Sequence, residues 1–170
     1  MNSSTDVNKK STLDIKRLLN EYGNSVFRMC FLYLKDVQLA EDALQDTFIK
    51  VYNSYPEFKG YSNEKTWITR IAINTCKNYL RSSWWKLIDE SALLESIPSE
   101  ENLMWDDTLI VQIMKLSAKY KEVILLFYYQ DMKIREISEV LQIPESTVAV
   151  RLKRARETLK ISLKGWFYDE

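Results

Sequence analysis

The sequence has no histidine and only two cysteines, Cys30 and Cys76, which lie far apart in segments with an apolar pattern. Their number and spacing disfavour a zinc site, a Cys–His nucleophilic pair and a disulfide framework, so we expect two buried thiols in a reducing compartment. The three glycines are too dispersed to form a phosphate-binding loop. No carboxylate stands in a recognisable catalytic setting. We therefore predict a protein that is not an enzyme and that needs no metal or cofactor.

Long apolar runs are missing as well. No segment approaches 18 consecutive apolar residues, and the first residues lack the apolar stretch of a signal peptide, so we expect a cytoplasmic protein. Only three glycines and three prolines occur among 170 residues, while Leu, Ile, Lys and Glu are plentiful. This composition, with 46% hydrophobic residues, predicts one large or two small domains of helices joined by short connections.

Neither sign of charge is in excess, and the balance of 24 basic and 24 acidic side chains argues against a protein that coats nucleic acid by charge alone. The distribution along the chain is uneven. Residues 55–86 carry six basic and two acidic side chains, residues 86–107 one basic and seven acidic, and residues 133–164 eight basic and four acidic. Two basic blocks around an acidic stretch indicate two nucleic-acid-binding surfaces, although a solvated helix face would explain either block alone.

The first half of the chain has the apolar periodicity of three amphipathic helices. Residues 1–12 are polar and predict a flexible tail. The helices are expected over about residues 13–34, 39–51 and 67–80. A break at Lys35–Asp36 separates the first two, and the turn-forming segment 55–63 precedes the third. Three helices of this length can close a small core.

The second half begins with an acidic linker. Residues 83–107 have weak periodicity and contain Pro98, and we expect a short helical turn around Ser91–Ser96. Helical patterning then returns, with one helix over residues 109–116, a second over 119–130 and a final pair. The chain is therefore predicted to be all-α, with two helical domains, residues 13–82 and 108–164, joined by the linker.

The final two helices have the spacing of a helix-turn-helix. Ser138 is small where the two helices would cross closely, and Pro144 suits the first position of the second helix. The apolar stripe of the first helix consists of Ile134, Ile137, Val140 and Leu141. The buried face of the second consists of Val148, Leu152, Ala155 and Leu159. The side chains expected to face outward are Ser146, Val150, Lys153 and Glu157, flanked by Ala149 and Arg154, with Arg151 and Arg156 nearer the edges.

This geometry predicts that the second helix enters the major groove of duplex DNA, with its cations against bases or phosphates. An ordinary amphipathic helix with a basic solvent-facing side is the alternative. The length of the break, the proline and the small residue together favour DNA binding. DNA binding alone leaves the role open among repressors, activators and other nucleic-acid machinery.

Three segments resemble bacterial sigma factors. Residues 36–48 (DVQLAEDALQDTF) resemble the helix that binds core RNA polymerase, residues 67–81 (WITRIAINTCKNYLR) the promoter-melting helix, and residues 147–156 (TVAVRLKRAR) the recognition helix of the last domain. Their order, the acidic segment between them and the short chain match the extracytoplasmic-function (ECF) subgroup, which keeps only domains two and four. The resemblance covers about residues 13–82 and 109–162. Three motifs in this order are far more specific than any one of them.

The resemblance implies two functional surfaces in the first domain. One would dock on a coiled coil of the largest polymerase subunit through Asp42, Gln45, Asp46, Phe48 and Ile49. The other would capture unpaired bases of the −10 element. Flipping a base out of the duplex costs a few kcal/mol, and stacking and hydrogen bonds to the protein must offset that cost. The residues implied there are Lys59, Gly60, Tyr61, Ser62, Asn63, Trp67, Arg70, Asn74, Lys77, Asn78 and Arg81. Among them, Trp67 fits a core position better than a DNA contact.

In the second domain the resemblance implies recognition of duplex DNA at the −35 element. The residues implied are Ser146, Thr147, Ala149, Val150, Arg151, Lys153, Arg154 and Arg156. The acidic linker would pass through the polymerase channel that later holds RNA, although a soluble spacer would look the same. The implied partners are core RNA polymerase, promoter DNA and an anti-sigma factor that holds the protein at the membrane. The implied function is promoter-specific transcription initiation, without a small-molecule substrate.

The sequence departs from the family pattern at a few positions. Gln142 stands in the turn where members often have glycine, and a left-handed conformation there would cost about 1 kcal/mol. Ala149 and Val150 replace a basic and a small polar residue, and Thr69 replaces a frequent aromatic. Ser82–Trp85 replaces a basic run. The first three departures bear on the promoter sequence that is recognised, not on the class of activity.

Two other functions remain open at this point. A free-standing helix-turn-helix regulator would use its first domain to sense a ligand or to dimerise, and would bind a palindromic operator by itself. An anti-termination or structural interaction protein would bind mainly single-stranded RNA and would not open promoters. The order of the motifs in the first domain favours the sigma factor over both.

Overall fold

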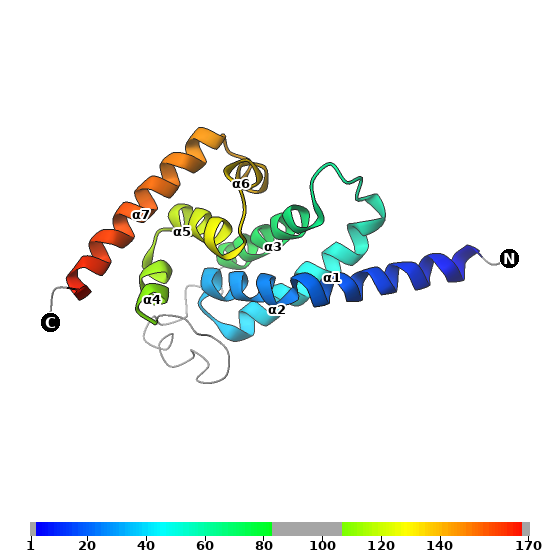
Figure 1. The fold of residues 1–170 in the computed structure, drawn as a ribbon. Helices are drawn as coiled ribbons and strands as arrows, with labels where there is room; N and C mark the ends of the chain where they lie inside the picture. The colour runs from blue at the N-terminus through cyan, green and yellow to red at the C-terminus, as the bar shows by residue number, and fades with distance from the viewer. Residues whose placement is uncertain (1–2, 83–106, 168–170) are drawn as a thin grey trace. The chain divides into compact units, whose positions relative to one another are not determined.

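The computed structural model describes the backbone of residues 3–82 and 107–167, and the side chains of residues 15–82 and 109–164. Within these ranges the regular elements are all helices. The chain divides into two compact units, Met1–Leu87 and Ile88–Glu170, which are described separately below (Figure 1). The prediction of an all-α protein is confirmed. The predicted linker helix around Ser91–Ser96 lies outside the described residues.

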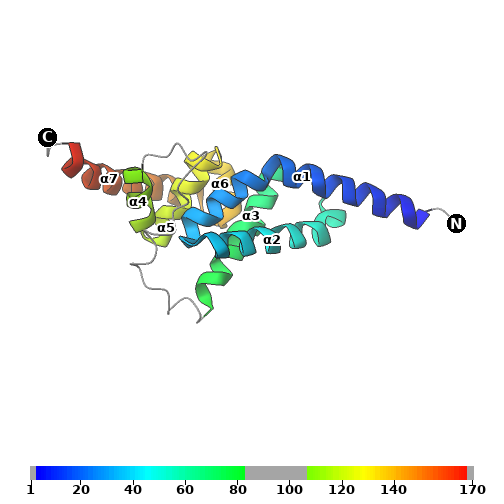
Figure 2. The same cartoon turned by 90° about the horizontal axis from the view of Figure 1, so that it is seen from below.

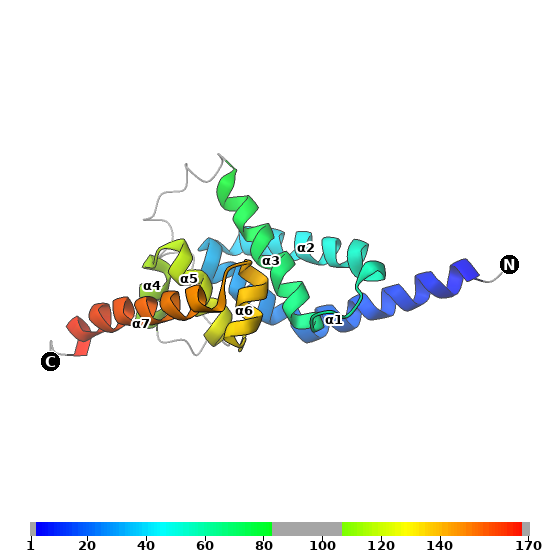
Figure 3. The same ribbon diagram turned by 90° about the horizontal axis from the view of Figure 1, so that it is seen from above.

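Three long helices build the first unit. They are α1 (Ser3–Leu34), α2 (Val37–Ser54) and α3 (Glu64–Arg81), with a short 3-10 turn, η1 (Tyr55–Glu57), after α2. Each of the three packs against the other two, so the unit is a small bundle. Figures 2 and 3 show that the N-terminal part of α1 extends past the bundle.

The start of α1 differs from the prediction. The helix begins at Ser3, within the segment 1–12 that the sequence predicts as a tail. This segment is polar but contains neither glycine nor proline, so nothing in it interrupts a helix that is nucleated further along the chain. Polarity alone does not distinguish a tail from a solvated helical extension.

The ends of the helices in this unit follow from side-chain capping. Lys35 adopts a left-handed conformation with φ of 61° after α1. Asp36 then caps α2, because its carboxylate accepts a hydrogen bond of 2.8 Å from the Leu39 N–H. Asn63 caps α3 in the same way, through a bond of 2.7 Å from the Thr66 N–H. The predicted break at Lys35–Asp36 is therefore confirmed.

The core of the bundle brings the two cysteines together. Cys30 on α1 and Cys76 on α3 are both fully buried among residues such as Met29, Ile68 and Ile73. A hydrogen bond with the Cys30 thiol, followed by burial, raises the pKa of the Cys76 thiol. The prediction of buried thiols is confirmed. The two cysteines are far apart in the sequence but are neighbours in the fold.

Among its described residues, the second unit has five helical elements. They are α4 (Asp107–Lys115), α5 (Ala118–Ile124), a π-helical segment η4 (Leu125–Tyr129), α6 (Ile134–Leu141) and α7 (Glu145–Phe167). The helix predicted over residues 119–130 thus changes its hydrogen bonding halfway, and the Gln130 N–H reaches back 3.1 Å to the Leu125 carbonyl. The spacing of the apolar residues does not distinguish the hydrogen bonds of an α-helix from those of a π-helix. Helix α7 packs against α4, α5 and α6.

Helices α6 and α7 form the predicted helix-turn-helix, with α6 lying beside the first part of α7 (Figure 3). Gln142 in the turn is left-handed, with φ of 55° and ψ of 45°, and its N–H donates to the Ser138 carbonyl. The Ser138 hydroxyl in turn donates to the Ile143 carbonyl. Pro144 lies one residue before the helix, where its carbonyl accepts from the Val148 N–H at 3.1 Å, and not at the predicted first position.

The buried faces of this pair agree with the predictions. Ile137 and Val140 of α6 are buried, and Ile134 and Leu141 are half-buried. The four positions predicted to face the core from α7, Val148, Leu152, Ala155 and Leu159, are all buried. The helical period therefore determines which side of α7 remains available for a ligand.

The turn at Gln142 can be tested by substitution. Gln142→Gly should raise the free energy of unfolding by about 1 kcal/mol, because glycine adopts the left-handed conformation without the steric cost that a Cβ imposes. Gln142→Ala, which keeps the Cβ, is the matched control and should bring no gain. Urea unfolding followed by circular dichroism measures both, and equal stability of the two variants would contradict the argument.

Candidate nucleic-acid and protein interfaces

The side of α3 opposite its buried face carries amides and cations. Thr66, Ile68, Thr69, Ala72, Ile73, Thr75 and Cys76 are buried on the opposite side. The positions three and four residues apart on the outer side are Trp67, Arg70, Asn74, Lys77, Asn78 and Arg81. Asn74, Asn78 and Arg81 are exposed, and the other three are half-buried. The structure thus brings the six predicted α3 positions together on one strip.

The loop before α3 supplies an exposed aromatic ring. Gly60 has φ of 72°, and a Cβ there would meet nothing within 4 Å, so the need for glycine is conformational and not steric. Tyr61, the next residue, is 92% exposed, and Lys59 is exposed beside it. Ser62 is half-buried. Asn63 uses its side-chain oxygen as the cap of α3, which is a structural role that the sequence pattern did not reveal.

An aromatic cluster connects the two ends of this loop. The ring centroids of Phe58 and Trp67 are 4.8 Å apart, and Tyr55 lies 6.0 Å from Phe58 and 6.1 Å from Trp67. The ring of Trp67 is half-buried in these contacts. These ring contacts make Trp67 a packing residue of the aromatic cluster.

A charged network anchors the first turn of α3. The Glu64 carboxylate accepts hydrogen bonds of 2.7 Å and 3.1 Å from the Arg17 guanidinium of α1 and one of 2.7 Å from the Tyr55 hydroxyl. The bonds from Arg17 hold the pKa of Glu64 below its usual value of 4.5, and the same contact raises the pKa of Arg17. Sequence analysis missed this network because its members are 47 and 9 residues apart.

Arg70 has an unsatisfied donor at the middle of the strip. Its Nε is buried and has no hydrogen-bond partner among the described residues. A buried donor without a partner costs about 1–3 kcal/mol, so a hydrogen bond to this group would relieve that cost. An acceptor such as a phosphate or a base edge would complete it.

The outer face of α2 carries the predicted protein-docking residues, with one correction. Asp42, Gln45 and Ile49 are exposed, Ile49 to 58%. Phe48, at 7% exposure, belongs to the core of the bundle and cannot offer its ring to a partner. The helical period places it about 100° from Ile49, far enough to face inward.

Two side-chain hydrogen bonds tie α2 to α3. The Tyr79 hydroxyl donates to the Asp46 carboxylate at 2.7 Å, and the Lys50 ammonium donates to the Thr75 hydroxyl at 2.9 Å. Burial, followed by the bond to Asp46, raises the pKa of Tyr79. Asp46 is half-buried in this contact, so one of its carboxylate oxygens is already used inside the protein.

In the second unit, the exposed side of α7 borders a polar hollow of about 320 Å³. It is lined by Lys119, Tyr120, Ser146, Thr147, Val150, Arg151 and Arg154. Lys119 lies with its ammonium 5.1 Å from the Tyr120 ring centroid. These two residues were missed by sequence analysis, because only the fold places the start of α5 next to the start of α7.

Arg156, predicted to contact DNA with its neighbours, is engaged elsewhere. Its Nε donates to the Tyr128 hydroxyl at 2.8 Å, and its guanidinium lies 5.1 Å from the Phe127 ring centroid and 5.6 Å from that of Tyr128. It does not line the polar hollow. The helical period explains the correction, since Arg154 and Arg156 are about 200° apart around α7.

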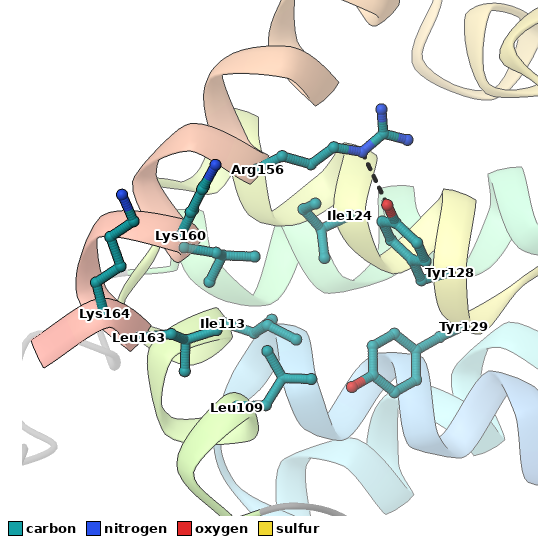
Figure 4. A pocket seen from close by; sticks show the side chains of 10 residues that line it. Leu109, Ile113, Ile124, Tyr128, Tyr129, Arg156, Lys160, Leu163 and Lys164 are labelled. Atoms are coloured by element: carbon teal, nitrogen blue, oxygen red, sulfur yellow. Dashed lines mark hydrogen bonds between the residues drawn. The ribbon is translucent and has the colours of Figure 1, made fainter. Parts of the chain in front are cut away.

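Arg156 instead borders an apolar cavity of about 510 Å³ (Figure 4). The lining comprises Leu109, Ile113, Ile124, Tyr128, Tyr129, Leu159 and Leu163, with Arg156, Lys160 and Lys164 of α7. Burial raises the pKa of Tyr129. The aliphatic side chains form the interior, and the three cations of α7 lie along one side.

Among the residues that the structure describes, no cluster of three or more potential metal-binding side chains occurs. None of the described helices combines the length and the hydropathy that a membrane span requires.

Sequence models of two regions match this chain. Sigma-70 region 2 matches residues 18–86, and Sigma-70 region 4 matches residues 107–159. The chain therefore contains a sigma-70 region 2 in its first compact unit and a sigma-70 region 4 in its second.

Relatives define the family more closely. The ECF RNA polymerase sigma-E factor of Haemophilus influenzae is 31% identical over 159 residues, which cover 84% of each chain. The ECF RNA polymerase sigma factor SigW of Bacillus subtilis is 29% identical over 163 residues, covering 86% of this chain and 87% of SigW. This chain belongs to the ECF sigma factors, and it directs promoter-specific initiation by RNA polymerase.

Solved structures share the fold. The sigma factor RpoE, in complex with the anti-sigma factor NepR from Bartonella quintana, superposes with a TM-score of 0.75 at 21% identity, covering 92% of this chain and 99% of RpoE. CnrH, in complex with the cytosolic domain of CnrY, gives a TM-score of 0.70 at 21% identity, covering 89% and 88%. The family assignment confirms the resemblance and decides against the regulator and the RNA-binding protein.

The anchor at the start of α3 predicts a pH dependence. Because the pKa of Glu64 is lowered in the folded state, its contribution to stability is present above its unfolded pKa of about 4.5 and is lost as the pH falls through the lower folded value. Glu64→Gln should therefore cost about 1 kcal/mol of unfolding free energy at pH 7, a figure that allows for partial exposure of the pair. The difference from the unmodified protein should vanish at low pH.

Glu21→Gln is the matched control. Glu21 also pairs with Arg17, at 3.1 Å, but both side chains of that pair are about half exposed. We expect a smaller loss, measured by urea unfolding between pH 3 and about 7. A pH-independent difference for Glu64→Gln would mean that its role is steric and not electrostatic.

Proposed function

We propose that the outer strip of α3 and the loop before it recognise the melted −10 element, and that the exposed side of α7 recognises the −35 element. We also propose that residues 13–82 and residues 108–164 are the two functional domains, as the sequence predicts. Residues 83–107 would connect them, and residues 1–12 would belong to neither. The observation that carries the assignment is the α3 strip itself. Its amides and cations form one face, with the unsatisfied Nε of Arg70 at its middle.

In the −10 assignment, different side chains meet different parts of the strand. Tyr61 has an exposed ring on which an unpaired base can stack, which stabilises a flipped base by about 1–3 kcal/mol. The side-chain amide of Asn74 can both donate to and accept from a base edge. Arg70, Lys77 and Arg81 would contact phosphates and hold the strand along the helix.

The −35 assignment uses the start of α7, as in other helix-turn-helix proteins. Ser146, Ala149, Val150 and Lys153 would face the base edges. Lys119, Arg151 and Arg154, which line the polar hollow, would contact the phosphates on one side. Arg156 is left out of this set, because its guanidinium is held by Tyr128.

For the polymerase we propose the exposed part of the α2 face, Asp42, Gln45 and Ile49, with the outer oxygen of Asp46. The exposed aliphatic chain of Ile49 beside acidic and amide groups fits a helical partner with basic and apolar residues. The catalysis belongs to the polymerase in this proposal, and this chain contributes no catalytic group. The protein would act in the bacterial cytoplasm, where its polymerase partner is found.

An anti-sigma factor is proposed as a further partner, supported by the relatives solved in complexes with NepR and CnrY. The apolar cavity with Arg156, Lys160 and Lys164 along one side would suit an amphipathic segment with acidic residues on a partner protein. A membrane-linked anti-sigma factor would hold the protein at the membrane until it is released.

The −10 assignment can be tested at Asn74. Asn74→Ala should lower the rate of open-complex formation about tenfold or more, because a lost base-edge contact removes about 1–3 kcal/mol of discrimination. Binding to core polymerase should stay unchanged. Permanganate reactivity of −10 thymines and co-elution with the polymerase measure the two. Asn24→Ala, an exposed asparagine on α1, is the matched control; normal melting by Asn74→Ala would overturn the assignment.

The −35 assignment predicts opposite results for two neighbouring arginines. Arg154→Ala should weaken holoenzyme binding at −35 and reduce the slope of log affinity against log salt by about 1, as expected for one lost phosphate contact. Arg156→Ala should leave that slope unchanged. Filter binding of holoenzyme to promoter fragments over a salt series gives both slopes. Equal effects of the two substitutions would contradict the division of α7 into two faces.

A further inference from the structure

The part of α7 assigned to base contacts contains two apolar residues among its polar and cationic neighbours. Ala149 and Val150 are both exposed, and Val150 has 49% of its surface open to solvent. Val150 lines the polar hollow together with Arg151 and Arg154. Its methyl groups therefore lie beside the cations assigned to the DNA phosphates, on the side of the helix that would face the bases.

The buried face of α7 does not require a valine at this position. The buried stripe of α7 consists of Val148, Leu152, Ala155 and Leu159, and Val150 lies about 200° around the helix from Val148. A β-branched residue at an exposed helical position is also a poorer helix former than alanine or lysine. Packing and helix stability would both be satisfied by another residue, so the methyl groups point to a ligand.

The chemistry of the major groove restricts what that ligand can be. Each base pair presents hydrogen-bond donors and acceptors there, and the C5 methyl group of thymine is the one apolar group on the four base edges. Neither Ala149 nor Val150 has a side-chain donor or acceptor. They cannot distinguish bases by hydrogen bonds, but they can make apolar contact with a thymine methyl group.

We propose that Val150, with Ala149 beside it, recognises the C5 methyl group of a thymine in the −35 element. This inference rests on the proposed role of α7 and adds to it a specific base and a specific atom. Ser146, Lys153 and Arg154 then supply the polar contacts around it. The −35 element of this protein must accordingly contain a thymine, on either strand, at the base pair that faces Val150.

Replacing thymine with deoxyuridine tests this directly, because it removes only the methyl group. The −35 element is first located by in vitro transcription with the reconstituted holoenzyme, and each of its thymines is then replaced singly. At one or two positions the affinity of the holoenzyme should fall about fourfold, the loss expected when one methyl group is no longer buried. Competition binding with labelled promoter fragments measures the change.

Variants of the protein identify the residue. Val150→Ala should bind the deoxyuridine and thymine promoters with nearly equal affinity, whereas Val150→Thr, which keeps one methyl group, should retain part of the preference. Lys153→Ala is the matched control, and it should weaken binding to both promoters by the same factor. Both positions are exposed on the same helix, so the three substitutions leave the core intact.

Three results would overturn the inference. They are an unmodified holoenzyme insensitive to deoxyuridine at every −35 thymine, a Val150→Ala variant that keeps the full preference, and a −35 element without thymine. In each case promoter-specific initiation itself would persist. The proposed −35 role of α7 fails differently, by Arg154→Ala leaving −35 binding unchanged, so the two failures are distinguishable.

Discussion

The carboxylate of Glu64 at the first turn of α3 is the point at which three segments of the first unit are joined by hydrogen bonds. It accepts hydrogen bonds from Arg17 of α1 and from Tyr55 of η1, so three segments meet at a single group. The same turn is capped by Asn63. The loop that carries Tyr61 ends at this turn and α3 begins there, so the anchor fixes the junction between the loop and the helix. These contacts lie within the protein, so the start of α3 is positioned before DNA binds.

Much of this architecture could be predicted from helical periodicity. The three helices of the first unit, the break at Lys35–Asp36 and the buried face of α7 all follow from apolar spacing and cap residues. The left-handed Gln142 was foreseeable, since a helix-turn-helix needs such a residue whether or not glycine is present. Periodicity decides which side of a helix is buried, and these features require nothing more.

The rest depends on contacts that are distant in sequence. In the sequence, Phe48 is next to exposed Ile49 and therefore resembles part of a docking motif. Consecutive residues of a helix point about 100° apart, and this difference places Phe48 in the core. Arg156 belongs to a run of basic residues, and only the position of Tyr128, 28 residues earlier, shows that its guanidinium is occupied. Lys119 and Tyr120 line the polar hollow with residues of α7 that come much later in the sequence, so only the fold shows that they belong to it. Charge patterns locate a surface approximately, and tertiary structure decides its membership.

The bonds between α2 and α3 have a mechanical consequence. Asp46–Tyr79 and Lys50–Thr75 are one helical turn apart on both helices, so they brace the pair at two points and resist both sliding and rotation. The face proposed to dock on polymerase and the face proposed to hold the opened strand then move as one stiff body without a hinge between them. Any tolerance for promoters of different spacer length must arise outside this unit. In the proposed assignment, the unit fixes the distance between its polymerase contact and its DNA contact.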